Sequence, residues 1–175
     1  MRLLKWILGV FGVLVVVFLV GAALISPTYR VERNTIIDAP AAKVYALIAD
    51  PRAWTRWTVW NRREPDMKMT FSGAPSGQGA KWECEGKDGK GTMEFTAAEP
   101  GKSITYRLGF VEMNMFSTGA LTLTPQGDAT RISWTNEGNV GRNPMMRWFV
   151  PFMDSMMGPD FEGGLTNLKA LAEKS

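Results

Sequence analysis

Histidine is absent from this 175-residue sequence, and cysteine occurs once, as Cys84. A Ser-His-Asp or Cys-His triad therefore cannot be built, and zinc would lack the Cys and His ligands that it usually requires. A single cysteine also excludes an intrachain disulfide, which fits a reducing compartment but is compatible with an oxidising one. We expect neither a metal nor a cofactor.

Runs of basic residues are also absent. The chain has 20 Lys and Arg against 17 Asp and Glu, a formal net charge of +3. Two of these cations, Arg2 and Lys5, precede the first apolar stretch, and without them the excess is a single charge. A nearly neutral folded region offers little attraction to phosphates, so the sequence argues against nucleic-acid binding.

One long apolar run lies near the N-terminus. Trp6 to Ile25 contains 20 residues and no charge, and a helix needs about 20 apolar residues to cross a bilayer. Ser26-Pro27 ends the run, because proline disfavours helix at the preceding residue. We predict a transmembrane anchor at residues 1–26 and one folded domain at 27–175. A cleaved signal sequence is the alternative, although its apolar region is usually about 7–15 residues long.

The charges that flank the run bear on orientation. Arg2 and Lys5 favour a cytoplasmic N-terminus. Arg30, Arg33 and Lys43 follow the run and weaken this bias. We expect a single-pass membrane protein whose domain lies on the periplasmic or extracellular side.

The folded region begins with one strand and two short helices. Tyr29 to Asp38 is typical of a strand, and Pro40 suits the first turn of a helix, where its missing N–H costs nothing. Asp50-Pro51 ends that helix and can begin a second one through Trp54.

From Lys68 onward, apolar residues recur at every second position, which is typical of an antiparallel sheet with one apolar and one wet face. Residues 87–90, 99–102 and 126–128 have the composition of hairpin turns. The apolar face comprises Met69, Phe71, Ala80, Trp82, Cys84, Met93, Phe95, Ile104, Tyr106, Leu108, Phe110, Leu121, Leu123, Ile132 and Trp134.

The C-terminal region returns to helical spacing, and we expect Gly158-Pro159 to interrupt it. One apolar face is predicted before the interruption and a second one after it. The first face comprises Phe149, Phe152, Met153 and Met156, and the second Phe161, Leu165, Leu168 and Ala172. The fold class is therefore α+β, with a curved antiparallel sheet of about seven strands around a long C-terminal helix.

Three local motifs carry a family resemblance: Ile37-Asp38-Ala39-Pro40 with Val44-Tyr45, Asp50-Pro51 with Trp54 and Trp57, and Gly158-Pro159-Asp160-Phe161-Glu162 with Leu165, Asn167-Leu168 and Leu171. With these motifs, residues 30–173 resemble the SRPBCC superfamily, the START-like proteins of the polyketide cyclase/dehydrase and lipid-transport type, and in particular membrane-anchored bacterial members of unknown function. The resemblance implies a helix-grip fold. It does not imply one activity, because the superfamily includes binders, carriers, cyclases and coenzyme-A-linked proteins.

A curved sheet around one helix leaves an apolar space that suits a ligand. We predict that its wall comprises Trp60, Phe71, Trp82, Met93, Phe95, Tyr106, Phe110, Trp134, Met153, Met156, Met157 and Phe161. The methionines are compatible with core filling, with an adaptable pocket wall or, least of all, with copper(I) capture. For Trp54 and Trp57 their size favours the core, whereas Trp60, Trp82 and Trp134 suit core and ligand contact equally.

Acid–base candidates are few. Asp154 and Asp160 lie among apolar neighbours, where a raised pKa would suit proton transfer, although Asp160 also suits the first turn of a helix after Pro159. Tyr106 could donate a hydrogen bond to a ligand or belong to the core. Asp154 and Tyr106 are thus weak catalytic candidates, and Cys84 is interpreted as inert packing.

Three functions remain. The first is a module at the membrane surface that binds or carries a lipid-like or polycyclic small molecule. The second is a cyclase- or dehydrase-type enzyme in which one carboxyl or tyrosine moves a proton. The third is an accessory domain whose pocket its own side chains fill. Strand alternation places no ionisable group in the pocket, which favours the first and third hypotheses over an enzyme, while Arg62-Arg63 and Lys68 suit either an anionic head group or a solvated loop.

Overall fold

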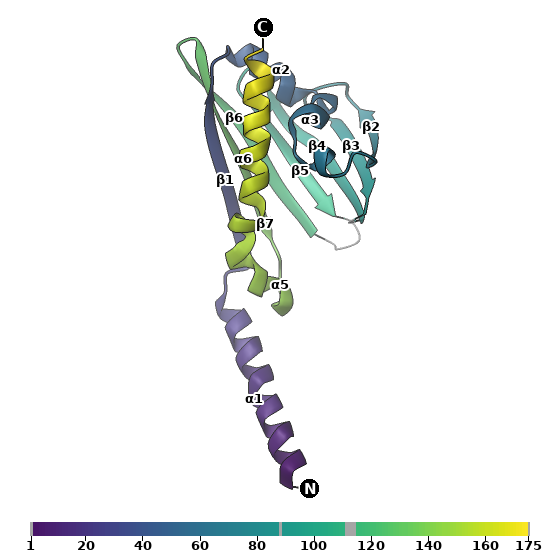
Figure 1. Ribbon diagram of the computed structural model, residues 1–175, viewed down its shortest axis with the longest axis vertical. Coiled ribbons are helices and arrows are strands. Elements are labelled where there is room, and N and C mark those ends of the chain that lie inside the picture. Colours follow the sequence, from purple (N-terminus) through teal and green to yellow (C-terminus); the bar gives the residue numbers. More distant parts are fainter. Residues whose placement is uncertain (1, 88, 111–114, 175) are drawn as a thin grey trace.

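The first helix projects from the rest of the chain. The computed structural model describes residues 2–87, 89–110 and 115–174, and in it α1 (Arg2–Leu24) extends away from the domain (Figure 1). Within these residues, α1 alone is long and apolar enough to cross a membrane, and most of its side chains are exposed. The apolar run thus forms one continuous helix, as its composition predicts.

The domain is built on a seven-stranded antiparallel sheet in the order β1-β7-β6-β5-β4-β3-β2. The strands are β1 (Thr28–Ile37), β2 (Lys68–Gly73), β3 (Ala80–Gly86), β4 (Gly89–Glu99), β5 (Ser103–Phe110), β6 (Met115–Gln126) and β7 (Ala129–Asn139). Strands β2 to β7 pair with their neighbours in the chain, whereas β1 pairs with β7. The predicted sheet of about seven antiparallel strands is therefore confirmed.

Glycines make two of the hairpin turns possible. Gly101 between β4 and β5 has φ +72°, and Gly127 between β6 and β7 has φ +62°. Side chains with a Cβ rarely adopt these left-handed angles, so glycine suits both turns. The third predicted turn, at 87–90, includes Asp88, which lies outside the described residues.

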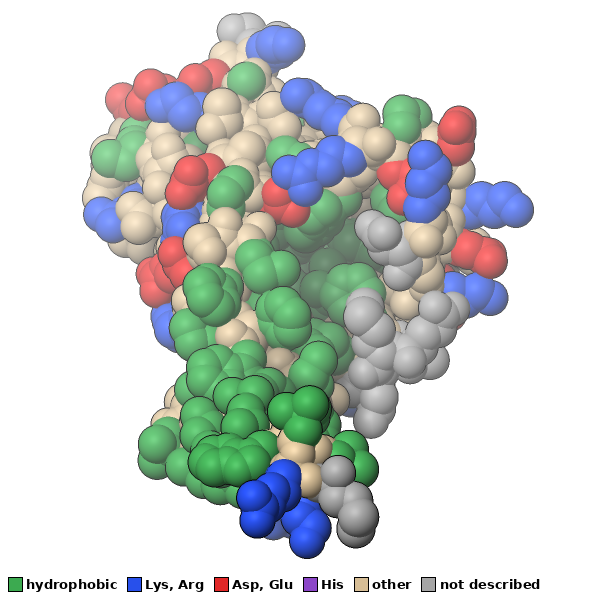
Figure 2. Space-filling view, turned by 60° about the horizontal axis from the view of Figure 1, so that its bottom comes forward, with side chains coloured by type: hydrophobic (Ala, Val, Ile, Leu, Met, Phe, Trp, Pro, Cys, Tyr) green, Lys and Arg blue, Asp and Glu red, His purple; other side chains and the backbone are tan. Residues whose placement is uncertain are grey.

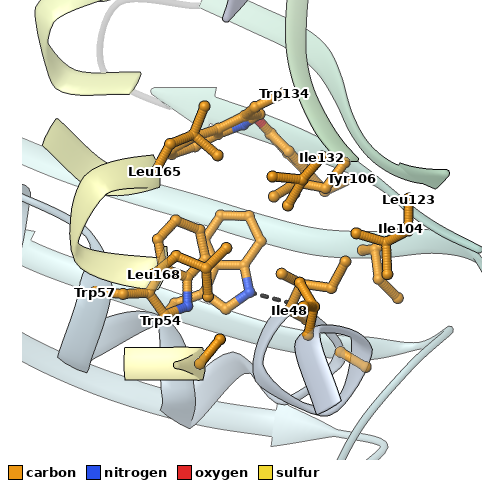
Figure 3. Packing of buried hydrophobic residues seen from close by; sticks show 14 of the residues in the cluster. Ile48, Trp54, Trp57, Ile104, Tyr106, Leu123, Ile132, Trp134, Leu165 and Leu168 are labelled. Carbon is orange, nitrogen blue, oxygen red and sulfur yellow. Dashed lines mark hydrogen bonds between the residues drawn. The ribbon is translucent and has the colours of Figure 1, made fainter. Parts of the chain in front are cut away.

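Three short helices connect β1 to β2: α2 (Ala41–Ala49), α3 (Pro51–Trp57) and α4 (Trp60–Arg63). Pro40 precedes the first turn of α2, and the Asp50 carboxylate caps α3 by accepting a hydrogen bond of 2.8 Å from the Arg52 backbone N–H. The Trp54 indole then reaches back and donates to the Ile48 carbonyl at 2.8 Å (Figure 3). These bonds fix α3 against α2 and bring its tryptophans over the sheet.

The C-terminal region comprises α5 (Pro144–Phe149), the 3-10 helix η1 (Val150–Phe152) and α6 (Met153–Ala172). The predicted interruption at Gly158-Pro159 is wrong, because α6 continues through Pro159 and the α-helix is interrupted at η1 instead. Met153 and Phe161 are both buried. Their packing holds the two sides of Pro159 in one helix, despite the backbone N–H that proline lacks.

The apolar face predicted before Gly158 is also wrong in most of its members. Met153 is buried, but Phe149, Phe152 and Met156 are exposed. The 3-10 turn changes the angular spacing between residues, so Phe149 and Phe152 no longer share a face with Met153.

The helix α6 crosses the concave face of the sheet and lies along β1 (Figure 1). The Trp134 ring of β7 stacks on Phe161 of α6, with 4.1 Å between ring centroids and 7° between planes. Leu165 lies beside Trp134, and Leu168 lies beside Trp57 (Figure 3). We call this region, formed by β1, β6 and β7 under α6, the closed half of the concave face.

Candidate functional site

A cleft of about 330 Å³ lies over the other half of the concave face, between β2–β5 and the helices α3, α4 and α6. A wider depression of about 660 Å³ involves Arg30, Arg107 and Glu137, but it is shallow and polar. The cleft better fits a small-molecule site, since such sites are concave and mainly apolar. Its lining comprises Trp54, Thr58, Trp60, Asn61, Arg63, Glu64, Met67, Met69, Trp82, Cys84, Gly86, Gly89, Gly91, Met93, Leu108, Phe110 and Asp160.

Most of the cleft wall is apolar and adaptable. Met67 contributes from the residue before β2 and Met69 from β2 itself, and Met93 and Leu108 contribute from β4 and β5. Trp82 adds an aromatic face. Thioethers rotate easily and adjust to ligands of different shape, so this wall suits an apolar ligand better than a densely polar one.

A polar cluster occupies the α4–α6 side of the cleft. The Trp60 indole donates to Asp160 Oδ2 at 3.0 Å, Arg63 Nη1 donates to the same oxygen at 2.9 Å, and Arg63 Nη2 donates to Oδ1. The Asp160 side chain is 16% exposed and that of Arg63 63% exposed. The carboxylate is thus held in place from α6, while the guanidinium is accessible to solvent.

The position of Asp160 differs from the helix-cap interpretation. It lies well inside α6 rather than in a first turn, because α6 begins at Met153. Its carboxylate is therefore bound by side chains of α4 and is not free to cap a helix end.

Glu64 ties α4 to the turn at the end of β3. Its Oε1 accepts a hydrogen bond of 2.8 Å from the Lys87 backbone N–H. On the other side of α4, Thr58 Oγ1 donates to Asn61 Oδ1 at 3.2 Å. Both contacts hold this four-residue helix as a wall of the cleft, although its own length gives it little stability.

Cys84 contributes its half-buried side chain to the cleft. Burial raises the pKa of the thiol above its ordinary value, so the neutral form is favoured. A neutral thiol is a poor nucleophile and behaves as a small apolar group.

The twelve predicted wall residues occupy different environments. Those that line the cleft are Trp60, Trp82, Met93 and Phe110. Those buried in the core outside the cleft lining are Phe95, Tyr106, Trp134, Met153 and Phe161. Phe71 is half-buried beneath the Arg52 guanidinium, Met157 is half-buried beside the core, and Met156 is exposed.

Tyr106 lies on β5, and its side chain contacts the closed half at Trp134 of β7. Its hydroxyl accepts a hydrogen bond of 2.8 Å from Trp134 Nε1, and the side chain is fully buried. Burial raises the pKa of this phenol to about 12, so it stays protonated near neutral pH. Its ring also lies over Gly119, where an added Cβ would come within 2.2 Å of it.

The expectation of a raised pKa for Asp154 is wrong. Arg33 donates to both carboxylate oxygens, at 2.8 and 2.9 Å, and these hydrogen bonds lower the pKa of the carboxyl. Asp154 is exposed on the surface of α6 and does not line the cleft. The carboxylate is therefore stabilised in its charged form.

Strand alternation missed the ionisable groups of the cleft. Arg63, Glu64 and Asp160 line it, contrary to the expectation that no such group would, because they come from α4, α6 and the residue after α4 rather than from strands. The Arg62-Arg63 pair was the available signal for one of them. In the described part of the chain, no three His, Cys, Asp or Glu side chains gather as a metal site would require.

The cleft is visible from the end of the domain that carries α1. Figure 2 shows this end, with a hollow lined by hydrophobic side chains and charged groups at its far side. The hydrophobic surface continues from the hollow toward the base of the domain. An apolar ligand would thus meet few charges on this side.

A curved antiparallel sheet that grips a C-terminal helix and leaves an apolar cleft defines the helix-grip class of proteins. Within that class, the chain belongs to the family described as polyketide cyclase / dehydrase and lipid transport, whose model matches residues 28–173. The SRPBCC resemblance of the sequence is thereby confirmed. No curated protein matches the chain.

Solved structures agree on the fold. A protein of Arthrobacter aurescens is 20% identical with a TM-score of 0.60, over 83% of this chain and 87% of its own. A protein of Chromobacterium violaceum is 19% identical with a TM-score of 0.61, over 84% and 99%. Norcoclaurine synthase of Thalictrum flavum, solved with a transition-state analogue, is 14% identical with a TM-score of 0.63, over 83% and 94%. At these identities the likeness concerns the fold alone.

Proposed function

We propose that α1 anchors this protein in a membrane and that the cleft binds or carries a hydrophobic small molecule, lipid-like or polycyclic, at the membrane surface. The observation that carries the proposal is the cleft of about 330 Å³ with its methionine and tryptophan walls. Family membership supports ligand binding as the general role. We place the anchor at residues 1–26 and the domain at 27–175, on the periplasmic or extracellular side.

The polar cluster suggests how a ligand would be oriented. An apolar chain or ring would contact Met69, Trp82 and Leu108, and a polar head would face Arg63. Arg63 is exposed, so its guanidinium can turn to an anionic head, and the Trp60 indole then remains as the hydrogen-bond donor to Asp160 Oδ2.

A cyclase- or dehydrase-type enzyme is the second candidate, because ionisable groups line the cleft. It has less support than binding. Asp160 is the carboxyl nearest to the apolar wall, but Trp60 and Arg63 already engage it. Asp154 and Tyr106 do not line the cleft, so a ligand there would not meet them.

The test is native mass spectrometry of the full chain released from detergent, with organic extraction of what copurifies. The variant Leu108→Trp fills the cleft, and Arg107→Trp places the same ring on the opposite face of β5 as a matched control. We expect an apolar adduct in the wild type and in Arg107→Trp, and its loss in Leu108→Trp.

Circular dichroism melting shows whether each variant is folded. If Leu108→Trp does not fold, Leu108→Phe provides a smaller side chain at the same position. A wild-type protein that carries no apolar compound and binds no fatty acid or phospholipid would contradict the proposal. Equal binding by Leu108→Trp would place the ligand elsewhere.

A further inference from the structure

The base of the domain carries an exposed apolar surface that the cleft does not use. We call α5, η1 and Met156 the foot. Its exposed large apolar residues are Met145, Trp148, Phe149, Phe152 and Met156. Phe152 is 58% exposed, and between Asn143 and Met153 the sequence has one charge, Arg147. Contiguous apolar surface of this kind usually marks an interaction site.

The foot is fixed to the last turns of α1. The Trp148 ring stacks on Phe18 with centroids 5.9 Å apart, and its Nε1 donates to the Phe18 carbonyl at 3.3 Å. Gly21 makes room for this indole, since a Cβ there would lie 2.6 Å from it. The foot therefore lies beside the apolar run of the helix rather than beyond its end.

Arg147 is turned away from the outer surface of the foot. Its Nη1 lies 3.4, 3.3 and 3.4 Å from the carbonyl oxygens of Ala22, Ala23 and Ile25. The last turn of α1 has no basic residue of its own, so Arg147 supplies the cation that suits a helix C-terminus. This contact removes the only charge of α5 from the outer surface, which stays apolar.

Depth along α1 indicates what covers the foot. Phe18 precedes the end of the run at Ile25 by about 10 Å, at ~1.5 Å per residue. If α1 crosses a bilayer with this run among the acyl chains, Trp148 thus lies up to about 10 Å below the boundary between head groups and acyl chains, a depth that apolar faces bound at this boundary reach. We propose that the foot inserts into this interface of the bilayer that α1 crosses, as a second membrane contact that rests on the proposed anchoring.

The second contact would fix the orientation of the cleft. A domain attached by one helix alone can rotate relative to the membrane surface. A second contact at the foot restricts this rotation. The hollow and the foot share one face of the molecule, with hydrophobic side chains between them (Figure 2). Insertion of the foot therefore presents the opening of the cleft to the lipid.

The test uses the full chain with Cys84→Ser, labelled with an environment-sensitive fluorophore at one introduced cysteine. Phe152→Cys probes the foot, Gln126→Cys probes the β6–β7 turn at the other end of the domain, and Val13→Cys probes α1. Vesicles of phosphatidylcholine contain a phospholipid with a nitroxide near the head group. We expect lipid quenching and blue-shifted emission at 152, and only iodide quenching from the water at 126.

The Val13 label separates this inference from the proposed anchoring. If label 13 is shielded from iodide and label 152 is quenched by lipid, both stand. If label 13 is shielded but label 152 is quenched by iodide alone, the foot is in water and the inference fails. If label 152 is quenched by neither agent, a protein partner covers the foot, and the inference fails as well. If label 13 is open to iodide, anchoring and the foot both fail.

Variants that introduce negative charges into the foot provide a second test. Phe149→Asp with Phe152→Asp should abolish lipid quenching of a label at Met156→Cys, while α1 keeps the protein in the vesicle. Ile36→Asp is the matched control, because Ile36 is an exposed apolar residue on β1. Unchanged quenching in the double variant would overturn the inference.

Discussion

The two halves of the concave face contain the same types of residue, but these residues form a packed core in one half and a cleft wall in the other. In the closed half, Trp134 stacks on Phe161 and its indole N–H is satisfied by Tyr106. In the cleft half, Trp82 and Met69 line the cleft, although Trp82 also packs against Trp54 of α3. Aromatic content therefore does not distinguish a core from a pocket. The distinction depends on how the helices lie above the sheet, since Phe161 of α6 covers Trp134 and Trp54 of α3 packs against Phe95.

The largest effect should come from the closed half. Trp134→Ala removes the stacked ring and leaves the buried Tyr106 hydroxyl without its donor. We expect a loss of about 3–5 kcal/mol in the free energy of unfolding, or a melting temperature lower by about 10 °C.

The matched variant Trp60→Ala should lower the free energy of unfolding by about half as much, because Trp60 is only half-buried. Circular dichroism melting of the full chain in detergent measures both. A larger loss from Trp60→Ala would mean that α4 belongs to the stabilising core and would remove the contrast between the halves.

A pair of strand glycines gives a smaller effect. An Ala Cβ at Gly119 would lie 2.2 Å from the Tyr106 ring, whereas at Gly91 its closest neighbour is the Cys84 thiol at 2.8 Å. The buried ring cannot move, but the thiol can rotate toward the cleft. We expect Gly119→Ala to cost about 1–3 kcal/mol and Gly91→Ala to be nearly neutral in the same denaturation assay. Equal costs would contradict the looser packing inferred for the cleft half.

The smallest effect on stability is expected at Asp154, and it should depend on pH. Arg33 lowers the pKa of this carboxyl below its ordinary 3.8, so its contribution to stability is present above that value and is lost as pH falls through the folded pKa. Asp154→Asn should lower the melting temperature slightly at about pH 7 and not at about pH 2.

The loop variant Asp66→Asn, also an exposed carboxylate, is the control for a general loss of negative charge. An Asp154→Asn effect that persists at low pH would show that the ion pair is not its source.

Periodicity predicted the sheet because alternation along a strand is local. The faces assigned to Trp82, Met93 and Tyr106 follow from a two-residue repeat that tertiary contacts did not alter. The same reasoning could not separate Met93, which lines the cleft, from Phe95 two residues later, which does not. Both side chains point to the concave face, and only the path of the helices above decides which one borders the cleft.

The sequence by itself determined the apolar N-terminal helix, the antiparallel sheet and the family, because each depends on the order of residues along short segments. The tertiary structure decided that α6 continues through Pro159, that Asp160 pairs with Arg63 on one side of the cleft and that Trp148 meets Phe18. These features join segments far apart in the chain. Their energies come from side-chain packing and from hydrogen bonds between elements, which no local pattern contains.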